Sequence, residues 1–155
     1  MTNKKNEIVK SATQDNERSF FADIEKILSK GRGKAHIAIN NVMVETYWLI
    51  GKRIVEQEQQ GKDRANYGEQ LLVKLSQHLS STLGKGFSYA NLKNFRQFYQ
   101  TWPDLEIRYA LRSELSWTHI RLIMRVDSEK ARQYYLNEAS EQRWSSRVLE
   151  RNIAF

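Results

Sequence analysis

The sequence predicts an all-α fold, a helical bundle of about six helices that contains a helix-turn-helix-like pair. Three observations support this fold class: apolar residues recur at helical spacing in several segments, strand-like alternation is scarce, and proline occurs once. Residues 1–18 are polar, and we expect them to form a disordered tail. Residues 19–155 are long enough for a single helical domain with a sizeable core.

The first half of this domain is predicted to contain two helices. Ser19 is a candidate N-cap for a short helix, FFADIEKILSKG, which Gly31 would end. A long helix is expected over residues 34–60, with a polar loop after it over residues 61–68.

The long helix carries apolar residues on two sides. One face, which is wide, contains Ala35, Ala38, Ile39, Val42, Met43, Leu49, Ile50 and Ile54. A second stripe, roughly 140° away at 100° per residue, consists of Ile37, Val44, Trp48 and Val55. Gly51 lies between the two and would let another backbone come close. Either this helix is the central member of the bundle, or the second stripe docks a second subunit or an adjoining domain.

Residues 70–103 predict two helices separated by a tight glycine turn. The first helix has one apolar stripe, made of Leu72, Leu75, Leu79 and Leu83. Gly84 follows this stripe, where a left-handed C-terminal residue is favoured, and Ser88 is a candidate N-cap for the second helix. The side chains of the second helix that should face the core are Leu92, Phe95, Tyr99 and Trp102. Pro103 ends this helix.

The helix pair is also the most basic part of the chain. Residues 70–103 contain no Asp or Glu but carry four cations, which is +4 of the chain's formal +7. Such a charge favours an anionic partner, either a nucleic acid or a membrane surface. No apolar run approaches the roughly 20 residues that span a bilayer. The first residues lack the apolar centre of a signal peptide, and cysteine is absent, so we expect a cytoplasmic protein.

The outer face of the second helix carries side-chain types that contact DNA. Arg, Lys, Asn and Gln pair with base edges, and a tyrosine near the helix start could reach a phosphate. The expected DNA-binding residues are Lys74, Lys85, Ser88, Tyr89, Lys93, Asn94, Arg96, Gln97 and Gln100. The same pattern also fits an ordinary helical hairpin with a solvated polar face.

Three more helices are predicted after an irregular segment over residues 104–112. Ser116 is the candidate N-cap of SWTHIRLIMRV, in which Trp117, Ile120 and Met124 form one stripe. Ser128 would cap a helix that reaches Gln142. Ser145 would cap the last helix, which runs to Ile153.

Enzymatic chemistry is hard to find in this sequence. The three histidines are isolated, with no HxxxH or HExxH spacing, and we interpret His119 as a local hydrogen-bonding residue. Gly84-Lys85-Gly86 lacks the lysine that a phosphate-binding loop carries after its last glycine. No Asp or Glu is followed two positions later by Lys, the [D/E]-x-K element of many metal-dependent nucleases. We therefore predict no catalytic residue, no metal site and no cofactor.

Four separated motifs nevertheless resemble one protein family in the same order. They are NNVMVETYWLIGKRIVEQEQ, YGEQLL…LS…LGKGFSYANLKNFRQFY, LSWTHIRLIMRV and WSSRVLERNI. Together they are similar to the YhcG-like proteins, which are bacterial and assigned to the PD-(D/E)XK nuclease superfamily. The resemblance covers about residues 35–153 and implies a helical N-terminal domain followed by a separate nuclease domain. Asn40-Asn41-Val42 departs from the family's usual Val-Asn order, which bears only on local packing.

The residues and the resemblance together predict a non-catalytic DNA-binding or targeting module of a bacterial PD-(D/E)XK-type nuclease. It would bind duplex DNA through the basic helix-turn-helix. The alternative is a dimerisation or protein-docking domain of the same nuclease that uses the Trp48 stripe. The expected partners are DNA, the C-terminal nuclease domain of a longer protein, and a second copy of the chain.

Overall fold

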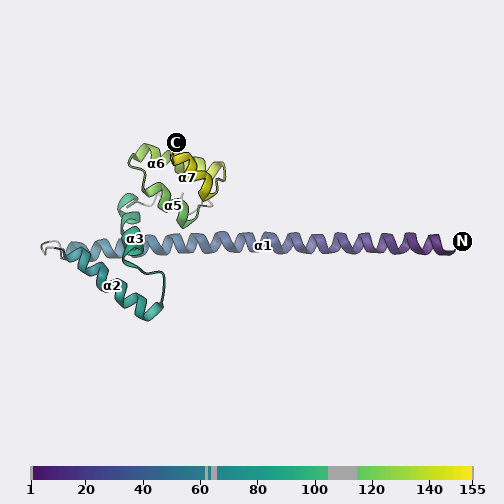
Figure 1. Cartoon of the computed structure of the whole chain (residues 1–155), viewed down its shortest axis with the longest axis horizontal. Coiled ribbons are helices and arrows are strands. Elements are labelled where there is room, and N and C mark those ends of the chain that lie inside the picture. Colours follow the sequence, from purple (N-terminus) through teal and green to yellow (C-terminus); the bar gives the residue numbers. More distant parts are fainter. Residues whose placement is uncertain (1, 62, 64–65, 105–114, 155) are drawn as a thin grey trace. The chain divides into compact units, whose positions relative to one another are not determined.

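The computed structural model describes residues 2–61, 63, 66–104 and 115–154 (Figure 1). Within these ranges the chain forms six helices and no strand, which confirms the all-α fold. The helices are α1 (Thr2–Gln60), α2 (Tyr67–Leu83), α3 (Tyr89–Thr101), α5 (Trp117–Met124), α6 (Glu129–Glu141) and α7 (Ser146–Ala154). The chain divides into two units, Met1–Ile39 and Asn40–Phe155. The irregular segment predicted from residue 104 lies outside the described residues from position 105 onward.

The first unit consists of the N-terminal part of α1. The sequence predicted a disordered tail and a short helix that Gly31 ends, whereas the structure has uninterrupted helix over residues 2–39. A glycine inside a helix costs about 1 kcal/mol relative to alanine, which is too little to end a helix flanked by good helix formers such as Lys30 and Lys34. Residues 3–36 are all exposed. The unit that contains the buried core begins at Asn40.

Among the described residues, the core of the second unit consists of three groups of buried side chains. The first joins α1, α3 and α5 and contains Val44, Trp48, Phe98, Ile120 and Met124. The second joins α1, α2 and α3 and contains Ile54, Leu72, Leu92 and Phe95. The third lies among the last three helices and contains Leu115, Ile123, Ala139 and Leu149. Figure 1 shows α5, α6 and α7 gathered together at the C-terminal end of the chain.

Parts of both apolar faces of α1 are buried, because Ile54 of the wide face lies in the core together with two residues of the second stripe. Val44 and Trp48, expected at a subunit interface, are 1% and 9% exposed and belong to the core, while Ile37 and Val55 are half-buried. Val42 and Leu49, expected in the core, are 60% and 50% exposed. The stripe built on Trp48 is therefore occupied within the chain, which corrects its assignment as a docking surface.

Gly51 explains why this side of α1 faces inward. A Cβ atom at Gly51 would overlap the carbonyl oxygen of Phe95 and lie 3.2 Å from Cβ of Tyr99. The backbone of α3 therefore approaches α1 more closely than any other residue at this position would allow. The close approach predicted at this glycine is confirmed, and it sets which side of α1 receives α3.

Four of the five predicted serine caps are confirmed, whereas Ser19 lies inside α1 and does not begin a helix. Ser88, Ser116, Ser128 and Ser145 accept hydrogen bonds from the backbone N–H three residues later, at 3.2–3.4 Å. His119 is the local hydrogen-bonding residue that the sequence predicted. Its Nδ1 lies 3.2 Å from the backbone N of Ser116, which donates to it, and its Nε2 donates to the carbonyl oxygen of Trp144 at 2.8 Å.

Candidate nucleic-acid interface

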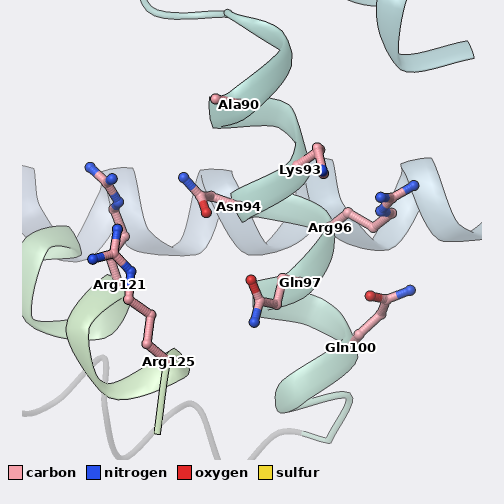
Figure 2. Close-up of a pocket in the computed structure, with 8 residues that line it drawn as sticks. All are labelled: Ala90, Lys93, Asn94, Arg96, Gln97, Gln100, Arg121 and Arg125. Atoms are coloured by element: carbon pink, nitrogen blue, oxygen red, sulfur yellow. The ribbon is translucent and has the colours of Figure 1, made fainter. Parts of the chain in front are cut away.

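The outward face of α3 and one face of α5 together line a polar pocket of about 650 Å³. Its lining residues are Ala90, Lys93, Asn94, Arg96, Gln97 and Gln100 from α3, with Arg121 and Arg125 from the neighbouring helix. Four of these eight residues are cations and none is acidic. In Figure 2, Asn94 and Gln97 lie on the side of α3 that faces Arg121 and Arg125. The pocket therefore presents positive charge and amide hydrogen-bonding groups from two helices at one place.

The buried side of α3 fixes which side chains reach this pocket. Leu92, Phe95 and Phe98 are between 0% and 2% exposed, and they hold the helix against α1, α2 and α5. Tyr99 and Trp102 were predicted in the core and pack at its edge instead, partly exposed. Because Phe98 takes the central position, the opposite face of the helix carries the polar side chains outward.

The sequence prediction did not include Arg121 and Arg125, the two pocket arginines that lie outside α3. Ile120, Ile123 and Met124 are buried and fix the rotation of α5. Arg121 lies on α5, and Arg125 is the C-cap residue directly after this helix. Arg125 has helical backbone angles, so the two residues, four apart, lie on the same side. Their helical spacing is visible in the sequence, but their position beside α3 depends on the packing of α3 against α5.

Arg121 lacks a partner for part of its guanidinium group. Its Nε is buried and has no hydrogen-bond acceptor among the described residues. Neither Arg121 nor the exposed Arg125 forms an ion pair within that part of the chain. A buried donor without an acceptor is costly, so an anion that enters the pocket would find arginine side chains whose charge is not already neutralised.

Arg96 is the cation of the pocket that is already paired. Its Nη1 lies 2.6 Å from Oε1 of Glu58 on α1, and both side chains are mostly buried, at 20% and 18% exposed. This bond holds the flank of α3 against α1. Arg96 therefore lies where the sequence placed it, but part of its hydrogen-bonding capacity is used within the fold.

Lys93 and Tyr89, both predicted to bind DNA, lie next to each other and have different roles. Nζ of Lys93 lies 5.3 Å from the centre of the Tyr89 ring, a distance suited to a cation–π contact. The Tyr89 ring packs against the apolar group that contains Leu92. Lys93 is exposed, so its ammonium group remains accessible to an anion.

Five of the nine predicted DNA-binding residues line the pocket. The other four are Lys74, Lys85, Ser88 and Tyr89. Lys74 is exposed on α2, and Lys85 is exposed in the connection between α2 and α3. Ser88 uses its side-chain oxygen as the N-cap of α3. The pocket therefore contains the predicted helix face but not the predicted turn.

The described part of the chain offers no site for a metal ion. No group of three His, Cys, Asp or Glu side chains lies close enough together there to hold one. No helix in the same ranges has the length and apolar character needed to cross a membrane.

Comparisons with known proteins identify the family of this chain. The family model of the DUF1016 N-terminal domain matches residues 23–155. The chain belongs to this family. It is also similar to the Escherichia coli (strain K12) protein named "Putative nuclease YhcG", with 33% identity over 83% of this chain. The chain spans 42% of the length of that relative. No solved structure matches this chain.

Proposed function

We propose that this DUF1016 N-terminal domain binds duplex DNA and thereby brings a nuclease part of a longer protein to its substrate. The observation that carries the proposal is the acid-free pocket, in which Arg121 of α5 and Arg125, directly after α5, lie beside the amide side chains of α3. The link to a nuclease is supported by the name of the E. coli relative, of which this chain covers 42%.

The two helices would contribute different contacts. The major groove of B-form DNA admits an α-helix, and α3 offers Asn94, Gln97 and Gln100 on its outer face. Arginine side chains beside such a helix are suited to the phosphates at the groove edge. In this arrangement α2 and α3 act as a helix-turn-helix, and Arg121 and Arg125 fix the register on the duplex.

The charge of the pocket predicts a measurable dependence on salt. Each phosphate neutralised on B-form DNA steepens the log–log dependence of affinity on salt by about 0.9. If Arg121 and Arg125 each contact one phosphate, their removal should reduce the slope by roughly 2. We expect micromolar affinity for non-specific duplex, since phosphate contacts supply most of such binding.

The test is fluorescence anisotropy of a labelled DNA duplex titrated with the full chain at several salt concentrations. The parent should bind with a clear salt slope, and the Arg121→Gln/Arg125→Gln variant should bind more weakly with a smaller slope. The matched control is Arg147→Gln/Arg151→Gln. This pair has the same spacing and is exposed on α7, away from the pocket lining. It removes the same total charge and should retain most of the affinity.

Three results would contradict the proposal. They are no binding at low salt, binding that does not respond to salt, and equal losses in the two double variants. The last would indicate a diffuse effect of net charge rather than a site. An RNA duplex of the same sequence serves as a competitor. Its deep and narrow major groove excludes side chains, so it should compete less well than DNA.

A further inference from the structure

The first unit of the chain has an apolar face that nothing in its own helix covers. Phe20, Phe21, Ile24, Ile27 and Leu28 of α1 are between 42% and 66% exposed. At 100° per residue they fall within a stripe about 120° wide. Further along the helix the same stripe continues through small residues, Gly31, Ala35 and Ala38, which are also exposed.

An isolated helix of this composition needs a partner. Most helical stability in proteins comes from packing of an apolar face rather than from intrinsic propensity. Gly31 and Gly33 each lower that propensity by about 1 kcal/mol relative to alanine. Residues 3–36 include no buried side chain. A partner that covers the stripe would supply the missing packing.

The stripe has the spacing of a coiled-coil seam. Successive intervals from Phe21 to Ala38 are 3, 4, 3, 4 and 3 residues, through Ile24, Leu28, Gly31 and Ala35. Apolar residues at alternating intervals of three and four keep one face of a helix against a second helix. The large side chains occupy the N-terminal half of this seam, and the small ones occupy the C-terminal half.

We propose that a second copy of this chain packs antiparallel against this seam. Only the reversed direction brings a large residue opposite a small one in every layer. One register does this throughout: it opposes Phe21 with Ala38, Ile24 with Ala35, and Leu28 with Gly31. Large and small side chains at facing positions interdigitate. In a parallel pair, Phe21 would instead face its own copy at one end, and Ala38 its own copy at the other.

The charges beside the seam favour the same register. Glu25 and Arg32 each directly follow a seam residue, at equivalent positions of the repeat. In the antiparallel register these positions lie next to each other across the pair. Glu25 of each copy then lies beside Arg32 of the other, which gives two ion pairs related by a two-fold axis. In a parallel pair these positions would face Phe20 and Ile27 instead.

The wider charge distribution supports the same direction. Residues 15–25 contain four acidic side chains and one arginine, whereas residues 26–34 contain four cations and no acid. A reversed second copy brings the acidic segment toward the basic one. A parallel copy would place the basic segments side by side, where like charges repel. Size and charge therefore select one occupant, a second copy of the same helix.

The first test is the molar mass of the full chain in solution, by light scattering at several concentrations. The parent should be a dimer. Ile24→Glu, which places a charge in the seam, should be monomeric. Ala22→Glu introduces the same side chain at an exposed position of the same helix outside the seam, and it should remain a dimer. A monomeric parent, or equal effects of the two substitutions, would overturn the proposal.

The second test addresses register without removing apolar residues. Arg32→Glu places one new glutamate beside Glu25 of the other copy at both ion pairs, and should weaken association by roughly tenfold or more. Adding Glu25→Arg restores opposite charges and should recover most of the affinity. If Ile24→Glu loses helical signal in circular dichroism, this pair of variants decides the proposal. A double variant as weak as Arg32→Glu alone would contradict the register.

The third test addresses direction and uses the absence of cysteine from the chain. Ala38→Cys should not form a disulfide with its own copy under oxidising conditions, but it should cross-link when mixed with Phe21→Cys. Efficient self-cross-linking of Ala38→Cys would indicate a parallel pair and overturn the proposal. These tests contain no DNA, so their outcome is independent of the DNA-binding titrations.

Discussion

The indole N–H of Trp48 donates a hydrogen bond of 2.9 Å to the main-chain carbonyl oxygen of Trp102, where α3 ends. The two residues are 54 positions apart in the chain. The Trp48 ring also packs edge-on against Tyr99, with ring centres 5.3 Å apart. This bond ties α1 to the end of α3 and satisfies the polar atom of a buried indole.

The first prediction concerns Trp48 itself. Trp48→Phe removes the hydrogen bond and part of the buried ring, and should lower the free energy of unfolding by about 2 kcal/mol. Trp48→Glu buries an unpaired carboxylate and should prevent stable folding of the second unit. Urea denaturation followed by circular dichroism measures both. A folded Trp48→Glu variant that differs from the parent only in molar mass would restore Trp48 as an interface residue.

The second prediction concerns Gly51. Gly51→Ala should destabilise the second unit by about 1–3 kcal/mol or more, because the new methyl group meets the carbonyl of Phe95. The control is Gly33→Ala, at a helical glycine with nothing within 4 Å. There the substitution should increase helical content, because alanine favours helix by about 1 kcal/mol. Thermal denaturation and the circular dichroism signal at 222 nm should therefore change in opposite directions in the two variants. Equal changes in both variants would contradict the close contact at Gly51.

The helices could be predicted well because their signals are local. Apolar spacing and serine caps depend on neighbours three or four residues away, and the caps at Ser88, Ser116 and Ser128 form as expected. The choice between the two apolar faces of α1 is different. It depends on the close approach of α3 to Gly51 and on the hydrogen bond from the Trp48 indole to the carbonyl oxygen of Trp102. Those contacts join distant parts of the chain, so periodicity alone could not decide how much of each face is buried.

The candidate site was half predictable for the same reason. The helical period predicted that Asn94, Gln97 and Gln100 share the outer face of α3, and all three line the pocket. Arg121 joins them through the packing of α5 against α3, which no local pattern encodes. Arg96 is paired with Glu58, which lies 38 residues earlier. The charge pattern of one helix therefore predicts its polar face. It does not predict which residues of other helices add charge to that face or neutralise it.

The third prediction follows from the ion pair between Arg96 and Glu58. Glu58→Gln removes the carboxylate that neutralises Arg96 at the flank of the pocket. The free energy of unfolding should fall by about 1 kcal/mol. Affinity for duplex DNA should rise roughly threefold to tenfold at low salt, because one more cation can neutralise a phosphate. Anisotropy and urea denaturation of the same preparation separate the two effects.

Arg96→Gln is the companion variant of this third prediction. It loses the same ion pair and should be destabilised to a similar extent, but it removes a cation and should bind DNA more weakly. Opposite shifts in affinity at similar stability are what a phosphate-contacting pocket requires. If the two variants bind DNA equally, Arg96 only holds α3 against α1 and does not contribute to the interface.

The last prediction is that this chain does not cut DNA. The [D/E]-x-K element is absent from the sequence, and the chain covers 42% of its E. coli relative. Supercoiled plasmid incubated with the purified chain and magnesium or manganese should remain intact under conditions where a metal-dependent nuclease used as a positive control nicks it. Metal-supported nucleases hold the ion through carboxylates. Reproducible nicking that disappears when one acidic residue of this chain is replaced by its amide would therefore show that the domain carries a catalytic site of its own.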